Sequence, residues 1–230
     1  MKRIILLSFI LFGFVKVDAQ TTVSRSSIGI TLGPSFPIGY FGKTEGSKSG
    51  GLAKVGGFLA IDYVYQFSSH FGLVLSGQGR RYGIDKDALN IHGVSKEINE
   101  AASFSAGTWR TGAIMGGIFH VLPLTKTGRL NFELKIMAGF QRTSSPDIST
   151  TVMVMGTQLQ QKSIASNAFA YLVGVGVRQH LTKKLALKFN ADYYGSNPEF
   201  RGGVYIGPTI SDMRRDTEAI NVGVGLVVDF

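Results

Sequence analysis

The sequence has no cysteine, few charged residues and no long apolar run beyond its first 19 residues. Without cysteine, neither a disulfide framework nor a thiolate metal site can form. Charged residues make up 17% of the chain, below the roughly 25% of an average globular protein. No later segment approaches the roughly 18 continuous apolar residues of a membrane-spanning helix, so we expect no such helix downstream.

Glycine and aromatic residues are plentiful instead. The 230 residues include 30 glycines, about twice the usual share of roughly 7%. The 16 Phe and 8 Tyr residues argue for a packed structure rather than a disordered glycine-rich chain. The net charge is +9, but the cations are scattered, whereas nucleic-acid binding needs a clustered basic face. We therefore expect attraction to anionic lipid headgroups and no nucleic-acid partner.

Residues 1–19 have the layout of a cleavable secretory signal. A basic start precedes the apolar stretch Ile4–Val15, and small residues lead up to a predicted cleavage between Ala19 and Gln20. A membrane anchor is the alternative, but about 12 apolar residues fall short of the roughly 20 needed to span. An exported, apolar chain without spanning helices has one membrane option, a closed barrel, which we assign to residues 20–230.

Eight segments of the remaining chain alternate apolar residues with glycine, polar and charged residues. They are Ser27–Gly33, Lys54–Phe67, Phe71–Tyr82, Trp109–Leu122, Leu130–Gln141, Ala168–His180, Leu185–Tyr194 and Ala219–Phe230. A soluble β-sandwich also alternates, but glycines among charged residues suit the narrow interior of a barrel of about 8 strands. The sequence predicts an all-β fold, a closed antiparallel up-and-down transmembrane β-barrel of eight strands.

Short and long connections alternate strictly between these segments. The short ones are 68–70, 123–129 and 181–184, and the long ones are 34–53, 83–108, 142–167 and 195–218. Outer-membrane barrels have short periplasmic turns and longer extracellular loops, so both termini are predicted to be periplasmic. Thr151–Met155 also alternates; it either extends the fifth and sixth segments or forms a further hairpin, which would make ten strands.

Charged residues on the predicted inner faces suggest a lumen network. Its members are Asp62, Arg80, Arg110, Glu133, Lys135, Arg178, Lys188 and Asp192. Ionised groups removed from water must be paired, so we expect these side chains to fill the lumen. A selective pore is the alternative, although wide aqueous channels appear at around 16 strands.

Aromatic residues on the predicted lipid-facing side fall into two girdles. The periplasmic girdle comprises Tyr65, Phe67, Phe71, Phe119, Phe132 and Phe230, and the outer girdle comprises Trp109, Phe140, Phe169, Tyr171 and Tyr193. In the fourth segment this assignment turns Trp109 and Phe119 toward lipid and Arg110 toward the lumen.

Two parts of the chain resemble known outer-membrane sequences. The last segment, with Val222, Val224, Leu226, Val228 and Phe230, resembles the terminal assembly signal of bacterial outer-membrane proteins, which implies recognition by the barrel-insertion machinery. The opening GITLGPSFPIG at residues 29–39 resembles the start of the PorT-like outer-membrane β-barrel family. That resemblance implies the fold and the outer-membrane location and no shared catalytic motif. Pro34 and Pro37 are expected to end the first segment.

Catalytic and metal-binding signals are weak. A hydrolase-like group could form from His92, Glu100 and either Ser103 or Ser105, but loop residues of these types are common. The spacing of Asp85, Asp87 and Asn90 faintly resembles a calcium loop, whose glycine at the sixth position and acid at the twelfth are missing. We expect no catalytic residue, metal or cofactor.

The long loops leave room for contacts outside the barrel. Arg201, Arg214 and Arg215 lie near one another in sequence and could contact lipopolysaccharide phosphates or a protein partner. Ordinary solvated loops are the alternative. The leading hypothesis is a non-enzymatic outer-membrane protein with a structural, surface-interaction or envelope-assembly role. A narrow solute channel is the second hypothesis and a lipid-modifying enzyme of the outer leaflet is the third.

Overall fold

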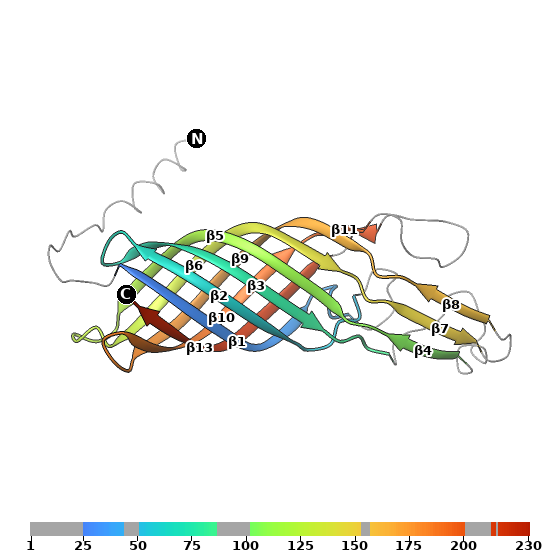
Figure 1. Ribbon diagram of the computed structural model, residues 1–230, viewed down its shortest axis with the longest axis horizontal. Coiled ribbons are helices and arrows are strands. Elements are labelled where there is room, and N and C mark those ends of the chain that lie inside the picture. Colours follow the sequence, from blue (N-terminus) through green and yellow to red (C-terminus); the bar gives the residue numbers. More distant parts are fainter. Residues whose placement is uncertain (1–24, 44–50, 87–101, 153–156, 201–212, 215) are drawn as a thin grey trace, which may run out of the picture.

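Eight long antiparallel strands close into one barrel (Figure 1). The computed structural model describes residues 25–43, 51–86, 102–152, 157–200, 213–214 and 216–230. The barrel strands are β1 (Ser26–Ile38), β2 (Gly56–Gln66), β3 (Phe71–Tyr82), β5 (Trp109–Pro123), β6 (Leu130–Ser144), β9 (Ala165–His180), β10 (Leu185–Ser196) and β13 (Thr217–Asp229). Around the barrel they follow the order β1-β13-β10-β9-β6-β5-β3-β2. The predicted fold class is confirmed, with eight strands.

The first strand closes the barrel because it pairs on both sides. Ile30 lies opposite Leu226 of β13 and opposite Ile61 of β2. Every backbone edge among the eight strands is thereby paired, which removes the exposed edges of an open sheet. Within the described residues, no helix is both long and apolar enough to cross a membrane.

The two prolines near the start of the barrel do not end the first strand as predicted. Pairing with β2 continues through Pro34, which lies opposite Gly57, while the register with β13 skips Gly33 and Pro34. A proline has no N–H to donate to a neighbouring strand. Gly33 allows the close approach at this point, since a Cβ there would lie 2.0 Å from the Val222 carbonyl oxygen. β1 therefore runs for 13 residues.

The two ends of the barrel differ. One end, which we call the turn end, carries the three short connections and brings Ser26 next to Phe230, whose backbone groups hydrogen-bond. The other end, the loop end, extends into a separate three-stranded sheet of β4 (Ala102–Ala106), β7 (Ile148–Val152) and β8 (Thr157–Gln161) (Figure 1). Of the alternating segment Thr151–Met155, the first two residues belong to β7, and residues 153–155 lie outside the described residues. Because β7 pairs with β4 and β8 outside the barrel, the alternative of a ten-stranded barrel is wrong. A two-stranded sheet of β11 (Glu199–Phe200) and β12 (Met213–Arg214) also lies outside the barrel.

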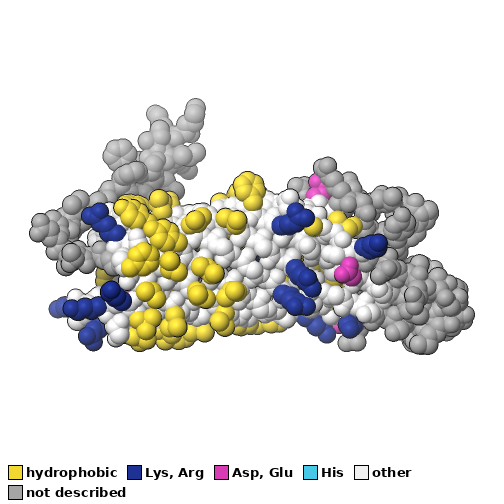
Figure 2. Space-filling model, viewed as in Figure 1, with side chains coloured by type: hydrophobic (Ala, Val, Ile, Leu, Met, Phe, Trp, Pro, Cys, Tyr) yellow, Lys and Arg dark blue, Asp and Glu magenta, His cyan; other side chains and the backbone are white. Residues whose placement is uncertain are grey.

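A belt of apolar side chains covers the outside of the barrel (Figure 2). Its larger members point outward along every barrel strand and include Ile30, Leu59, Leu75, Ile114, Ile136, Phe140, Phe169, Val175, Phe189, Val224 and Leu226. Phe140 is 74% exposed and Ile114 is 71% exposed. An exposed apolar surface of this extent marks contact with a membrane or with another apolar surface.

The orientation of β5 is opposite to the prediction. Trp109 and Phe119 are buried inside the barrel, at 4% and 2% exposure, and Arg110 points outward. Ile114 and Ile118 face outward in their place. The alternation misleads here because both faces of this strand carry large apolar residues. The assignments of Trp109 and Phe119 to the girdles, and of Arg110 to the lumen, are therefore wrong.

Candidate functional site: the charged lumen and its two ends

Ionised side chains of both signs fill part of the lumen. The buried charged residues are four carboxylates and four cations, namely Asp62, Glu133, Asp192, Asp229, Arg80, Lys135, Arg178 and Lys188. They come from β2, β3, β6, β9, β10 and β13, so the network exists only when the sheet has closed. The formal charges of this set cancel, as burial of ions requires.

The centre of the network joins two lysines to three carboxylates. Lys188 Nζ lies 2.9 Å from Glu133 Oε2 and 4.0 Å from Asp62 Oδ2. Lys135 Nζ lies 3.2 Å from Asp192 Oδ2 and 3.6 Å from Asp62 Oδ2. Asp62 is therefore shared by both lysines, and it also accepts a 2.5 Å hydrogen bond from the Ser76 hydroxyl. Shared carboxylates connect the ion pairs into one network.

Toward the turn end the network continues through Arg178. Its guanidinium lies 3.5 Å from Glu133 Oε1 and 3.0 Å from Asp229 Oδ1. His180 Nε2 lies 3.2 Å from the other oxygen of Asp229. The predicted network did not include Asp229. Its position in the alternation of the last segment places it on the inward face, so the sequence pattern was sufficient to predict it.

Toward the loop end Arg80 is held by neutral groups. Its guanidinium carbon lies 3.5 Å from the centre of the Tyr194 ring, which is a cation–π contact. Arg80 also donates to the side-chain oxygen of Gln78, and Gln78 donates to the Ser76 hydroxyl over 3.0 Å. Tyr194 in turn donates to Gln141. These polar side chains link the arginine back to Asp62 without a direct ion pair.

A cluster of buried apolar side chains shares the lumen with the charges. It consists of Val64, Val74, Ala113, Met115, Phe119, Val121, Met137, Ala170 and Leu172, with Tyr194 at its border. Phe119 lies beneath the Lys188 ammonium, 5.8 Å from ring centre to nitrogen. β5 carries no buried charge and supplies four members of this cluster, Ala113, Met115, Phe119 and Val121.

Glycine makes room for the longest of these side chains. A Cβ at Gly174 would lie 2.1 Å from Asp192 Oδ1 and 2.8 Å from Lys135 Cε. A Cβ at Gly223 would lie 2.7 Å from the Phe58 ring. In so narrow a barrel, small residues at some inward positions are the condition for large ones at others.

A buried aromatic cluster lies at the loop end of the barrel. Phe41, just after β1, packs edge-on against Tyr82 and Trp109, with ring centres 5.0 and 5.6 Å apart. Trp109 also packs against Phe200 of β11, 5.8 Å away. The indole N–H of Trp109 donates to the Gly51 carbonyl over 3.0 Å. We call this group, which also contains Ala53, Ile84 and Ala219, the aromatic plug.

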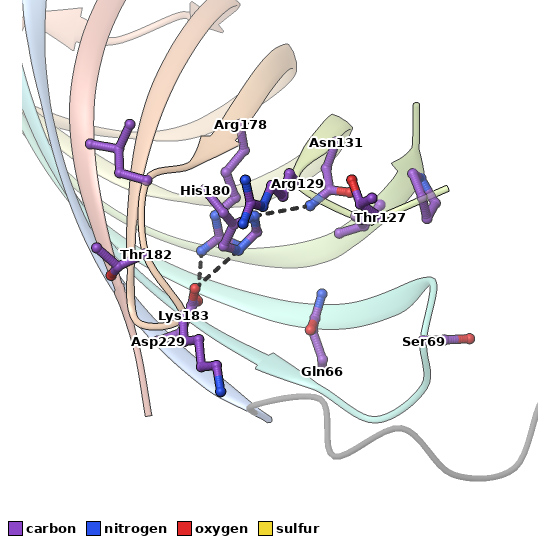
Figure 3. Close-up of a pocket in the computed structure, with 14 residues that line it drawn as sticks. Gln66, Ser69, Thr127, Arg129, Asn131, Arg178, His180, Thr182, Lys183 and Asp229 are labelled. Carbon is purple, nitrogen blue, oxygen red and sulfur yellow. Dashed lines mark hydrogen bonds and ion pairs between the residues drawn. The ribbon is translucent and has the colours of Figure 1, made fainter. Parts of the chain in front are cut away.

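The turn end opens into a polar vestibule of about 630 Å³ (Figure 3). Arg178, His180 and Asp229 form its floor, and Arg129 and Lys183 lie at its side. Asn131 approaches the other ring nitrogen of His180, at 3.5 Å. Arg178 and Asp229 belong both to the lining of the vestibule and to the charged network, so the two adjoin at this point.

The other candidate residues are not brought together by the described parts of the chain. His70 and His120 stack on each other at the turn end, 6.4 Å between ring centres. His92 and Glu100 lie outside the described residues, as do Asp87 and Asn90, and Asp85 instead pairs with Lys54 at 3.2 Å. Across the described ranges, no group of three His, Cys, Asp or Glu residues could hold a metal ion.

Several further predictions fall on parts of the chain that the structure does not describe. The cleavage site at Ala19 and Gln20 is outside the described residues, as are Arg201 and Arg215. Of the third clustered arginine, Arg214, only its place in β12 is described.

Solved structures of bacterial outer-membrane proteins are similar to this barrel. Neisserial surface protein A is 12% identical over 91% of this chain and 100% of its own, with a TM-score of 0.50. The attachment invasion locus protein Ail of Yersinia pestis is 13% identical over 89% of this chain and 97% of its own, with a TM-score of 0.48. A major outer membrane protein of Thermus thermophilus is 14% identical over 89% of this chain and 99% of its own, with a TM-score of 0.49. No protein-family model and no curated protein sequence matches the chain.

Proposed function

We propose that this chain is an integral protein of the bacterial outer membrane, with a plugged lumen, that acts through the surface at its loop end. The exposed apolar belt supports the membrane location, because such a wall is stable in hydrocarbon and costly in water. The fold shared with Neisserial surface protein A is consistent with that location. The PorT-like opening at residues 29–39 supports membership of that family as a further part of the proposal.

The observation that supports a plugged lumen is the buried network of ion pairs, whose charges sum to zero. Asp62 of β2 is three strands away from both β6 and β10, yet it lies 3.6 Å from Lys135 of β6 and 4.0 Å from Lys188 of β10, so these ion pairs cross the lumen. A passing solute would have to separate buried ion pairs, and separating such a pair costs several kcal/mol. The aromatic plug forms a second barrier at the loop end.

The proposed surface role follows from the two unequal ends. Both barrel termini lie at the turn end, and barrels of this type keep their short turns in the periplasm. The loop end, with the sheet of β4, β7 and β8, would then project from the cell. A sheet held clear of the membrane offers a surface, and backbone edges, for a partner. We infer a structural or surface-interaction role in the envelope rather than catalysis.

The C-terminal strand supports assembly by the barrel-insertion machinery. Val222, Val224, Leu226, Val228 and Phe230 all point outward, with exposures between 41% and 59%. They form an unbroken apolar face along β13 that ends in the aromatic residue. We propose that this face is the assembly signal, and replacing Phe230 with serine should lower the folded yield in cells.

Conductance of purified protein in a planar lipid bilayer tests the plugged reading. We expect no discrete current steps from the wild type, because the ion-pair network and the aromatic plug both lie in the path of a solute. Steady steps from the unaltered protein would overturn the plugged reading. They would favour a narrow channel, the second candidate, for which the 630 Å³ vestibule would be the entrance.

A further inference from the structure

Three arginines gather on the outer wall of the barrel near its loop end. Arg81 of β3, Arg110 of β5 and Arg142 of β6 all point outward from adjacent strands. Figure 2 shows lysine and arginine side chains along the loop-end border of the apolar belt. The predicted clusters did not include this one, because Arg110 was assigned to the lumen.

The register sets these cations side by side. Arg81 lies directly opposite Arg110, and Arg142 lies opposite Gly112, one outward position further along β5. Like charges directly opposite each other in a sheet are destabilising. Among the described residues, none of the ion pairs includes these three arginines. Arg81 is oriented by a 3.0 Å hydrogen bond from its Nε to the Thr108 hydroxyl.

A groove runs along the wall from the arginines toward the apolar belt. It has a volume of about 780 Å³, and its lining includes Leu32, Gly57, Leu59 and Gly79 together with Arg81 and Arg110. It lies over β1, β2, β3 and β5 on the outside of the barrel. One end of the groove is therefore cationic and its sides are apolar.

The glycines of this region are not needed by the barrel itself. A Cβ at Gly79 or Gly112 would meet nothing within 4 Å, and one at Gly57 would make only an ordinary contact. Their backbone does not adopt the left-handed conformation that favours glycine. This contrasts with Gly174, which a side chain could not replace without displacing the charge network. On the outer wall, the absence of side chains at these glycines leaves the space that forms the groove.

We propose that this groove binds one phosphorylated lipid of the outer leaflet, with a phosphate on Arg81, Arg110 and Arg142 and an acyl chain along the glycines. Arginine suits phosphate because its planar guanidinium donates two parallel hydrogen bonds. A phosphate would also relieve the repulsion between Arg81 and Arg110. The position of the arginines, beyond Phe140 and Ile114 at the edge of the belt, is the level at which headgroups meet hydrocarbon.

The inference rests on the proposed membrane location and goes beyond it by naming a ligand class and its site. A soluble anion would use the arginines but not the apolar groove, whereas a neutral lipid would use the groove alone. Only a lipid with a phosphate uses both, so we commit to that source.

The test measures binding of fluorescent lipid A, carrying two phosphates, to the folded full-length mature chain in zwitterionic detergent micelles. We expect Arg81→Gln/Arg110→Gln to weaken binding by about tenfold or more, since hydrogen bonds to charged groups are involved. Gly79→Leu, which fills the groove, should also weaken it severalfold. The matched controls are Lys126→Gln/Lys184→Gln, which removes two exposed cations at the turn end, and Gly116→Leu on the wall outside the groove.

The same lipid without phosphates, and inorganic phosphate alone, complete the design. Tight binding of the phosphate-free lipid, or equal losses in the arginine variant and the lysine control, would overturn the proposal. If millimolar inorganic phosphate displaced lipid A and Gly79→Leu did not weaken lipid A binding, the arginines would form a simple anion site. That result would also overturn the proposal. The heat-shifted gel band reports folding of each variant, and bilayer conductance tests the plugged lumen separately, so failure of one proposal leaves the other open to its own test.

Discussion

Removing Glu133 from the lumen should destabilise the barrel strongly. This carboxylate is 3% exposed and lies 2.9 Å from Lys188 and 3.5 Å from Arg178. Glu133→Leu keeps much of the side-chain volume but leaves the lumen with a net positive charge. Loss of one partner of a buried ion pair costs about 3–5 kcal/mol, because the remaining charge is buried without compensation.

The partners that Arg178 and Lys188 keep after the substitution indicate where in this range of about 3–5 kcal/mol the loss of stability should fall. Arg178 retains Asp229 at 3.0 Å, whereas Lys188 retains only Asp62 at 4.0 Å. The uncompensated charge is therefore mainly that of Lys188, and we expect a loss of about 3 kcal/mol in the free energy of unfolding. For comparison, Lys54→Met breaks the exposed pair with Asp85 and should cost less than about 1 kcal/mol.

Urea unfolding in lipid vesicles can measure this loss. Trp109 is the one tryptophan of the chain and is buried in the aromatic plug, so its fluorescence reports opening of the lumen. Lys188→Met should lower the free energy of unfolding by a similar amount. The double variant Glu133→Leu/Lys188→Met should be more stable than either single variant by about 2 kcal/mol, since replacing a whole buried ion pair with apolar residues is often neutral. Unfolding of Glu133→Leu at the wild-type urea concentration, or simple addition of the two losses, would refute a stabilising pair between Glu133 and Lys188.

Further predictions concern packing, orientation and topology. Gly174→Ala should cost about 1–3 kcal/mol because its methyl group would meet a carboxylate oxygen at 2.1 Å, whereas Gly77→Ala, with nothing within 4 Å, should leave urea unfolding nearly unchanged. Fluorescence of Trp109 should resist quenching by lipids brominated in their acyl chains, and strong quenching would restore the outward orientation that the sequence suggested. Because the chain has no cysteine, Lys162→Cys at the loop end should react with an impermeant thiol reagent on intact cells, and Lys126→Cys at the turn end should not. Labelling of the second variant alone would reverse the proposed topology.

Much of the barrel could be predicted from the chain because the alternation of residues marks its lipid-facing side. Segments such as Leu130–Gln141 place only apolar or small residues on one face, so their parity admits one orientation. The eight alternating segments predicted the strand count, and the even count together with the alternation of short and long connections placed both termini at one end. Likewise, the inward positions of Asp62, Glu133, Lys135, Arg178, Lys188 and Asp192 followed from parity alone.

Alternation failed where both faces of a strand are apolar. In β5, Ile114 and Ile118 on one face are as apolar as Met115 and Phe119 on the other, so the pattern alone does not show which face points inward. The register does: Arg80 faces inward and lies opposite Thr111, so Thr111 and Trp109 also face inward. The site on the outer wall was missed for the same reason, since it depends on Arg110 facing outward beside Arg81.

The sequence alone determined which residues alternate, how long the connections are and which chemical groups are available. The tertiary structure decided the rest: β1 continues past its prolines and pairs with β13, Lys188 lies nearer to Glu133 than to Asp62, and Arg80 stacks on Tyr194. These pairings join residues that are far apart in the chain, from 55 positions for the lysine to 114 for the arginine. Local pattern carries no information on such distances, because they are fixed only when hydrogen bonding between strands sets every register at once.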